Sequence, residues 1–266
     1  MKLTMLGTGD ALATKCFNTC FLLRASGQSF LVDGGGGNGI LRQLSRAGTG
    51  WEAVREIFVT HKHLDHLLGI FWMLRLVCQH MASGEYEGEA RIYAHDEVVE
   101  ILGRAAKALL SKREASFVGG RLRLVAVNDG EHKTILGHDV TFFDVRSTKA
   151  KQFGFKMELG SGETLTCAGD EPLNSATEKF AEGGKWLLHE AFCLHSEAEL
   201  FRPYEKHHST VKDACETAER LGVKNLLLYH TEDKNLARRK ELYTAEGRKY
   251  FSGNLLVPDD LESFEL

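Results

Sequence analysis

The run His61-Lys62-His63-Leu64-Asp65-His66 constrains the fold of this chain more than any other segment. It directly follows Glu56–Thr60, a short segment rich in β-branched and aromatic side chains, which predicts a strand. Residues 67–81 after it are largely apolar, which predicts a buried helix. The polar run therefore lies where a strand ends and a helix begins, an order typical of an α/β protein.

Three imidazoles and one carboxylate within this run suit a divalent metal ion. Alternate residues of an extended segment project to the same side, so His61 and His63 can share one ion. Asp65 and His66 then turn toward a neighbouring ion. Such ligands favour zinc and also accept manganese or iron. A loop that is rich in histidine by chance is the competing interpretation, but the placement at a strand end favours a metal site.

Strand-like and helix-like segments alternate along the whole chain of 266 residues. The predicted strands are residues 2–6, 19–23, 29–32, 56–60, 91–94, 153–159, 164–167, 186–188, 225–229 and 255–257, with two or three antiparallel strands between 121 and 143. The predicted helices are residues 38–46, 67–81, 97–110, 173–181, 210–221 and 233–250, with Ser209 as an N-cap. No linker interrupts them, so we expect an α/β protein of two packed sheets with outer helices, as one domain over residues 1–266.

Charge and composition exclude some classes of function. The formal net charge is −4, whereas a dedicated nucleic-acid binder usually carries a basic balance or block. We interpret Arg238-Arg239-Lys240 as a solvated helix face. No apolar stretch reaches the ~20 residues of a membrane span, and residues 1–15 do not form a signal peptide. The six cysteines contain no C-x-x-C pair, so we expect reduced thiols in a cytoplasmic protein without a membrane partner.

Four further polar residues lie at the ends of predicted elements. Asp170, Glu190 and His230 each follow a predicted strand, and His208 precedes a helix. Taken singly, each has an ordinary interpretation, such as a Gly-Asp turn or a hydrogen-bonded structural histidine. A carboxylate beside an imidazole, however, can also act as an acid–base pair.

The order of these motifs resembles ribonuclease Z, the tRNA 3′-processing endonuclease of the metallo-β-lactamase superfamily. The matching motifs are His61-x-His63-x-Asp65-His66, Gly169-Asp170, His189-Glu190-Ala191, His208-Ser209-Thr210 and Leu227-Leu228-Tyr229-His230. Leu6-Gly7-Thr8-Gly9 and residues 30–34 add to them, so the resemblance covers nearly the whole chain. It implies a four-layer αββα sandwich of the metallo-β-lactamase fold and a metal-dependent phosphodiesterase.

The resemblance also implies a role for each motif. The implied metal ligands are His61, His63, Asp65, His66, Asp170 and His230. His61 and His63 would bind one zinc ion. Asp65, His66 and His230 would bind a second, and Asp170 would bridge the two ions. A hydroxide between the ions would attack phosphorus, helped by Asp65. The family further implies a homodimer.

The implied acid–base residues are His208 and Glu190. His208, oriented by Glu190, would stabilise the transition state or protonate the leaving oxygen. The neighbouring His207 lacks a counterpart in the family motif, and we expect it to be a surface residue.

Two departures from the family pattern affect these expectations. The family places another histidine ligand six residues before Gly154, where this chain has Thr148, a poor zinc ligand. We therefore expect the His61/His63 site to hold its metal less tightly. Bacterial ribonuclease Z also carries a long arm that grips tRNA, whereas only fourteen residues separate Phe155 from Asp170 here. The substrate remains open among RNA, a cyclic nucleotide and a small phosphodiester.

Two other functions also remain open on the sequence. One is hydrolysis of another ester, a lactone or a thioester, and the other is a non-catalytic sensory protein with a degraded metal site. Retention of Glu190 with His208 argues against the second. The glycine run 34–37 can cradle phosphate, but no Walker lysine follows it, so we expect it to let the backbone pass beneath the metal site.

Overall fold

The computed structural model describes residues 1–266, and its internal contacts divide them into two compact units. The first unit comprises residues 1–7, 19–128 and 261–266, and the second comprises residues 8–18 and 129–260. Each unit contains one seven-stranded sheet with its own helices, which confirms the α/β class. The prediction of a single domain over residues 1–266 stays a prediction.

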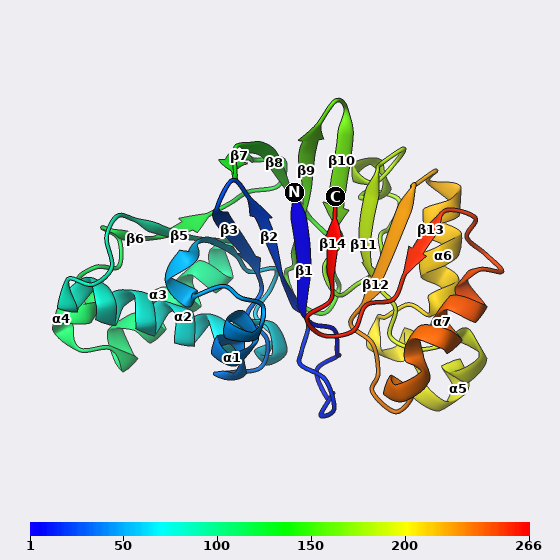
Figure 1. The fold of residues 1–266 in the computed structure, drawn as a ribbon, viewed down its shortest axis with the longest axis horizontal. Helices are drawn as coiled ribbons and strands as arrows, with labels where there is room; N and C mark the ends of the chain where they lie inside the picture. Colours follow the sequence, from blue (N-terminus) through cyan, green and yellow to red (C-terminus); the bar gives the residue numbers. More distant parts are fainter. The chain divides into compact units, whose positions relative to one another are not determined.

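The sheet of the first unit has the order β14-β1-β2-β3-β4-β5-β6 (Figure 1). Its strands are β1 Lys2–Gly7, β2 Cys20–Ala25, β3 Gln28–Val32, β4 Val54–Phe58, β5 Ala90–Ala94, β6 Leu122–Ala126 and β14 Ser263–Glu265. Pairing is antiparallel from β14 to β3 and parallel from β3 to β6. Because β14 pairs with β1, the two ends of the chain lie side by side.

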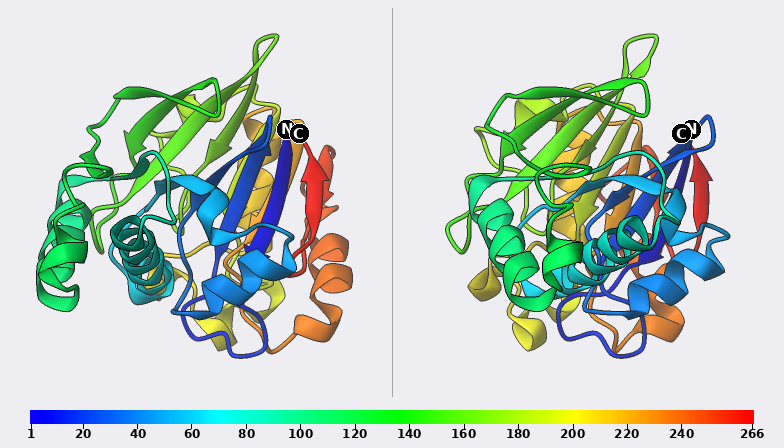
Figure 2. Two further views of the ribbon diagram at one scale, coloured as in Figure 1. Left: turned by 60° about the vertical axis from the view of Figure 1, so that its left-hand side comes forward. Right: turned by 90° about the vertical axis from the view of Figure 1, so that its left-hand side faces the viewer.

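Helices of the first unit gather on one face of this sheet, as Figure 2 shows. They are α1 Gly39–Arg46, η1 Trp51–Ala53, α2 Leu64–Ser83, α3 Asp96–Leu109 and α4 Lys112–Ala115. Helix α2 begins three residues earlier than predicted, with the extended residue His63 as its N-cap. Asp65 and His66 therefore lie in the first helical turn, where the helix dipole favours a carboxylate.

The sheet of the second unit has the order β13-β12-β11-β10-β9-β8-β7. Its strands are β7 His132–Ile135, β8 His138–Asp144, β9 Phe153–Gly160, β10 Glu163–Cys167, β11 Trp186–Glu190, β12 Asn225–Tyr229 and β13 Asn254–Leu256. Pairing is antiparallel from β7 to β10 and parallel from β10 to β13. The helices are η2 Glu178–Phe180, η3 His195–Glu197, α5 Ala198–Phe201, η4 Tyr204–Lys206, α6 Val211–Arg220, η5 Leu236–Arg238 and α7 Arg239–Gly247.

Three predictions for the elements were wrong in detail. Residues 173–181 form only the short η2, because side chains of Asn174 and Thr177 bond to nearby backbone N–H groups and compete with a helix. Strand β6 pairs in parallel with β5, so only β7 and β8 form the antiparallel pair expected between 121 and 143. The predicted helix 233–250 is shortened to η5 and α7.

The N-cap of α6 is Thr210 rather than Ser209. Its hydroxyl accepts a hydrogen bond from the Asp213 N–H, while the Asp213 carboxylate accepts one from the Thr210 N–H. This reciprocal pair forms a capping box. Ser209 remains outside the helix, and its N–H and hydroxyl both donate to Glu190.

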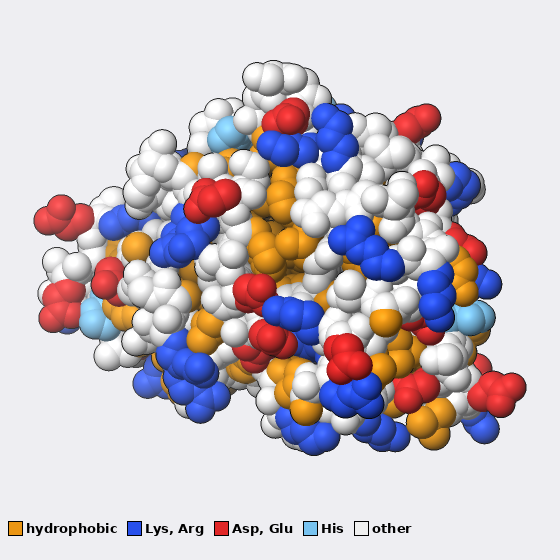
Figure 3. All heavy atoms as spheres, turned by 45° about the vertical axis from the view of Figure 1, so that its right-hand side comes forward, with side chains coloured by type: hydrophobic (Ala, Val, Ile, Leu, Met, Phe, Trp, Pro, Cys, Tyr) orange, Lys and Arg blue, Asp and Glu red, His pale blue; other side chains and the backbone are white.

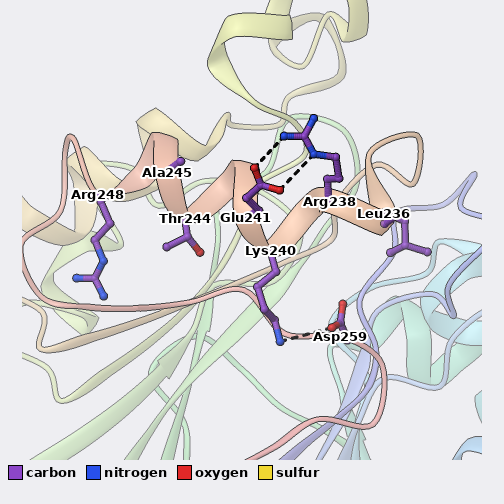
Figure 4. Close-up of a pocket in the computed structure, with 9 residues that line it drawn as sticks. Leu236, Arg238, Lys240, Glu241, Thr244, Ala245, Arg248 and Asp259 are labelled. Carbon is purple, nitrogen blue, oxygen red and sulfur yellow. Dashed lines mark hydrogen bonds and ion pairs between the residues drawn. The ribbon is translucent and has the colours of Figure 1, made fainter.

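The basic cluster on α7 is only partly solvated. Figure 4 shows Arg238 paired with Glu241 and Lys240 reaching Asp259 along a shallow pocket, as expected for an exposed helix face. Arg239 is only 1% exposed, and its guanidinium donates to the hydroxyls of Thr8 and Thr231 at 3.0 and 2.7 Å. The prediction of a solvated face was therefore wrong for Arg239.

No helix of the protein is both long and apolar enough to span a membrane. All six cysteines are free thiols, and five of them are buried. Buried thiols of this kind pack as small apolar side chains.

Candidate functional site

The first unit collects the histidines of the opening motif at the end of β4. His61 Nε2 and His63 Nδ1 lie 2.8 Å apart, so both ring nitrogens are directed to the same place. The His61 and His66 rings are 4.2 Å apart between centres, and His66 Nε2 lies 3.2 Å from Asp65 Oδ2. We call His61, His63, Asp65 and His66 the first cluster.

Two residues that the sequence did not single out as site residues orient this cluster. The Thr60 hydroxyl lies 2.9 Å from His61 Nδ1, and Asp33 Oδ2 lies 2.7 Å from His66 Nδ1. Asp33 also accepts hydrogen bonds from the Thr60 N–H and hydroxyl, both at 2.8 Å. Such outer contacts are typical of metal-binding histidines, because they fix the ring and leave its other nitrogen for the ion. The sequence signal for Asp33 was that residues 30–34 match the ribonuclease Z pattern.

The glycine run has the structural role that we expected. The Gly34 N–H donates to the His66 carbonyl at 2.8 Å, and the Gly69 N–H donates to the Gly35 carbonyl at 2.9 Å. A Cβ added to Gly69 would lie 1.8 Å from the Gly34 oxygen, and one added to Gly34 would lie 2.6 Å from the Ile70 nitrogen. Only glycine permits this close approach of the loop to α2.

The charges around the first cluster favour a cation. Burial lowers the pKa of His66, but the carboxylates of Asp65 and Asp33 outweigh it and hold this pKa well above the usual value. Nitrogen and oxygen donors held in this way fit zinc and related divalent ions.

The second unit brings Asp170, His208 and His230 together. Their potential ligand atoms all lie within 4.8 Å of one another, and we call them the second cluster. His230 Nε2 lies 3.8 Å from Asp170 Oδ2, and the His208 and His230 rings are 5.1 Å apart between centres. Asp170 and His230 are buried, so a carboxylate and an imidazole suited to a metal ion share one enclosed place.

His208 is held by a carbonyl and an aromatic ring. Its Nδ1 lies 2.9 Å from the Asp170 carbonyl oxygen, so Nδ1 carries the hydrogen and donates it. The imidazole also stacks on Phe192, with 5.1 Å between ring centres and 15° between planes. Burial, followed by the neighbouring His230, lowers the pKa of His208 to about 3 in this arrangement.

Glu190 is completely buried and lies beside His208. Its Oε2 is 3.7 Å from His208 Nδ1, while its Oε1 accepts a hydrogen bond from the Ser209 N–H at 2.5 Å. The Ser209 hydroxyl in turn donates to the Glu190 carbonyl at 3.0 Å. Glu190 therefore fixes the segment that carries His208 mainly through Ser209.

The segment around Thr148 borders the second cluster. The Thr148 hydroxyl lies 3.0 Å from His207 Nδ1, and Ser147 donates to Glu171 at 2.6 Å. His207 is exposed, as expected, and adopts a left-handed φ of +61°.

Comparisons with known proteins agree with this architecture. A family model described as anti-Pycsar protein Apyc1 matches residues 1–251. Ribonuclease Z of Brevibacillus brevis is 28% identical over 316 residues, covering 100% of this chain and 97% of that protein. The metallo-β-lactamase fold protein YhfI of Bacillus subtilis aligns with a TM-score of 0.79 at 19% identity, covering 100% of this chain and 99% of that one. Human tRNase Z, short form, aligns with a TM-score of 0.75 at 20% identity, with the same coverage.

These matches confirm the predicted metallo-β-lactamase fold and the resemblance to ribonuclease Z. The His/Asp clusters agree with the metal dependence that we predicted. The chain belongs to the family of the anti-Pycsar protein Apyc1, and it is a ribonuclease Z-like, metal-dependent hydrolase of the metallo-β-lactamase fold.

Proposed function

We propose that the chain hydrolyses small phosphodiesters, about the size of a nucleotide or cyclic nucleotide, and that zinc is its metal. The observation that carries this proposal is the second cluster, in which a buried carboxylate and imidazole adjoin His208. Donors of this kind hold a cation, and a neighbouring histidine can move a proton. Both contributions favour cleavage of a phosphodiester, because the cation stabilises charge on the phosphoryl oxygens and the proton stabilises the leaving oxygen.

The proposed metal ligands follow the two clusters. They are His61, His63, Asp65 and His66 of the first cluster and Asp170 and His230 of the second. A bound divalent ion supplies positive charge against the phosphoryl oxygens and lowers the pKa of a water molecule. Asp65, in the first helical turn, is proposed to orient that water by accepting a hydrogen bond from it.

His208 is proposed to exchange a proton with the substrate at Nε2. Its Nδ1 hydrogen is already donated to the Asp170 carbonyl, and stacking on Phe192 fixes the ring. Glu190 is proposed as a positioning residue, because its carboxylate holds the Ser209 N–H next to His208. An imidazole fixed in this way presents one defined nitrogen to the reacting oxygen.

The size of the proposed substrate follows from what the chain lacks. Strands β9 and β10 are joined by Ser161 and Gly162 alone, so no arm extends from this hairpin. The alignment with the Brevibacillus ribonuclease Z runs over 316 positions, more than this chain's 266 residues, so that relative carries additional segments. Figure 3 shows acidic and basic side chains mixed over the displayed face, whereas a long nucleic acid requires a run of cations.

RNA is the second candidate substrate, supported by the name of the relatives as ribonuclease Z. A short single strand requires fewer phosphate contacts than a folded tRNA. The same metal and the same His208 would serve this reaction.

Removal of metal tests the proposal. We expect the purified protein to hydrolyse methyl p-nitrophenyl phosphate, to lose this activity on exhaustive chelation and to regain it with zinc. Because Thr148 stands where the family pattern has a histidine ligand, and its hydroxyl bonds His207, we also expect fewer than two tightly held ions per chain by elemental analysis. Hydrolysis that survives complete metal removal would exclude the mechanism. Turnover of a lactone or thioester but of no phosphodiester would show that the substrate is a carboxylic ester or thioester instead of a phosphodiester.

A further inference from the structure

A pocket of about 290 Å³ in the second unit has no role in the proposed chemistry so far. Its walls include Leu12, Phe192, Leu200, Phe201, Lys206 and Lys234. Phe192 is shared with the second cluster, because its ring also stacks on His208 at 5.1 Å. The pocket therefore adjoins the residue proposed to move a proton.

The pocket combines apolar walls with unusual exposure. Leu12 is 84% exposed and Leu200 is 64% exposed, although both are large apolar side chains. Phe192 and Phe201 meet edge to face, with 6.1 Å between ring centres. Exposed leucines beside an aromatic pair favour binding of a flat apolar group, because that group would remove their apolar surface from water.

Two lysine ammonium groups cover the aromatic rings. Lys206 Nζ lies 4.6 Å from the centre of the Phe192 ring, and Lys234 Nζ lies 4.8 Å from the centre of the Phe201 ring. At an exposed site such a contact is worth only about two- to fivefold in an equilibrium constant. A nucleobase stacked on an aromatic side chain is worth about five- to 150-fold. A base can therefore displace the ammonium groups and release them for another partner.

The carboxylates of the pocket decide which part of a ligand enters. Asp10, Glu232 and Asp233 also line it, and Glu232 Oε2 already accepts hydrogen bonds from the Lys234 and Asn235 N–H groups. Negative charge repels a phosphate from the interior but tolerates a neutral heterocycle. The displaced lysines are long enough to keep their charge at the rim, where a phosphate would lie.

We propose that this pocket holds the nucleobase of the substrate, with Leu12, Leu200 and Phe201 around the ring and Lys206 and Lys234 on its phosphate. The inference rests on the proposed phosphodiesterase function and assigns the place where the base of a nucleotide substrate lies. It also explains why two apolar side chains remain exposed in the pocket that Phe192 lines.

Ligand binding without turnover tests the subsite directly. With metal-free protein, we expect calorimetry to show that adenosine 5′-monophosphate binds about tenfold or more tightly than ribose 5-phosphate, as stacking of one base predicts. The double variant Leu12→Ser/Leu200→Ser should remove most of this difference. Leu109→Ser, at a residue 71% exposed in the first unit, is the matched control and should preserve it.

The lysines provide a second arm of the test. Lys206→Ala and Lys234→Ala should each weaken the nucleotide several-fold, because they remove a phosphate contact. Lys179→Ala removes a similar lysine, 5.0 Å from the Phe180 ring and outside the pocket, and should have no effect. Equal affinity of the wild type for the two ligands, or equal losses for both in the leucine double variant, would overturn the subsite.

Turnover separates this inference from the proposed function. We expect a lower KM for thymidine 5′-(p-nitrophenyl) phosphate than for methyl p-nitrophenyl phosphate. The leucine variants should raise the KM for the thymidine diester and leave the KM for the methyl diester unchanged. Metal-dependent hydrolysis of both diesters with equal KM would sink the subsite and leave the proposed function standing. Base-dependent binding with no hydrolysis of any diester would overturn the proposed function and leave the base-binding pocket standing.

Discussion

At the scale of single residues, the adjacent His207 and His208 form a matched pair. His208 bonds the Asp170 carbonyl and stacks on Phe192, whereas His207 is exposed and contacts Thr148. We expect His208→Ala to lower kcat about 10²-fold and to leave metal content unchanged, because it removes the proton-transfer group. His207→Ala should keep kcat within about twofold, because His207 is not expected to transfer a proton to the substrate. Steady-state kinetics with parallel metal analysis measures both.

The opposite pattern would show that the two histidines are assigned wrongly. If His208→Ala strips the metal while His207→Ala abolishes turnover, the resemblance fails at this position. Full activity in both variants would mean that no side chain of this segment transfers a proton.

The residues of the site differ in how far the sequence could predict them. His61, His63, Asp65 and His66 were visible because local spacing alone brings them together. Asp33 and Thr60 were missed because their contact depends on the parallel pairing of β3 with β4, which places Val32 opposite Phe58. Ser209 was misassigned as an N-cap, because its sequence gives no sign that buried Glu190 binds its N–H.

At the scale of elements, the contact between α2 and the glycine loop supports the first cluster. A Cβ on Gly69 would lie 1.8 Å from the Gly34 carbonyl oxygen, so the backbone itself must move. We expect Gly69→Ala to lower the free energy of unfolding by about 1–3 kcal/mol, as for overpacking in a core. The displaced helix should also weaken metal binding, because Asp65 and His66 lie in its first turn.

Gly103 in α3 is the matched control. Its nearest neighbour to an added Cβ is Leu124 Cδ1 at 3.8 Å, an ordinary contact. Gly103→Ala should raise the free energy of unfolding by about 0.5–1 kcal/mol, because alanine favours a helix interior. Urea denaturation of both variants measures the difference. A Gly69→Ala protein as stable as Gly103→Ala would show that the loop and helix are not in this close contact.

Elements were predictable where local pattern determines them. Helix α1 and strand β12 matched closely, because amphipathic or apolar runs with clear ends specify them. Residues 173–181 failed because Asn174 and Thr177 offer the backbone other hydrogen bonds. The sequence predicted a strand at β6 but not its pairing partner, because parallel pairing with β5 joins segments about thirty residues apart.

At the scale of the whole molecule, the fold and the resemblance to ribonuclease Z were predictable because the motif order spans the chain, whereas the Apyc1 family was not predicted. The buried Arg239 shows the limit of that approach. Its sequence context is a basic cluster, yet its guanidinium joins Thr8 and Thr231, which are far apart in sequence. The homodimer implied by the resemblance stays a prediction, which sedimentation of the purified protein can measure.

The net charge of −4 and the two-residue connection between β9 and β10 lead to a prediction about large substrates. Binding of a folded nucleic acid depends mainly on contacts between cations and phosphates, which release counterions. A chain with no arm and no basic balance makes few of them. We therefore expect this protein to cleave precursor tRNA with a kcat/KM at least about 10²-fold lower than that of a ribonuclease Z assayed in parallel.

Turnover of methyl p-nitrophenyl phosphate in the same preparation is the control, because it shows that the metal and His208 are functional. Weak cleavage of precursor tRNA should also fall only slightly between 50 and 200 mM salt, since about 10³- to 10⁵-fold losses require six to ten phosphate contacts. Efficient cleavage with a steep salt dependence would contradict the prediction. It would mean that cations dispersed over the surface replace the missing arm, and that the acidic overall balance conceals a path for RNA.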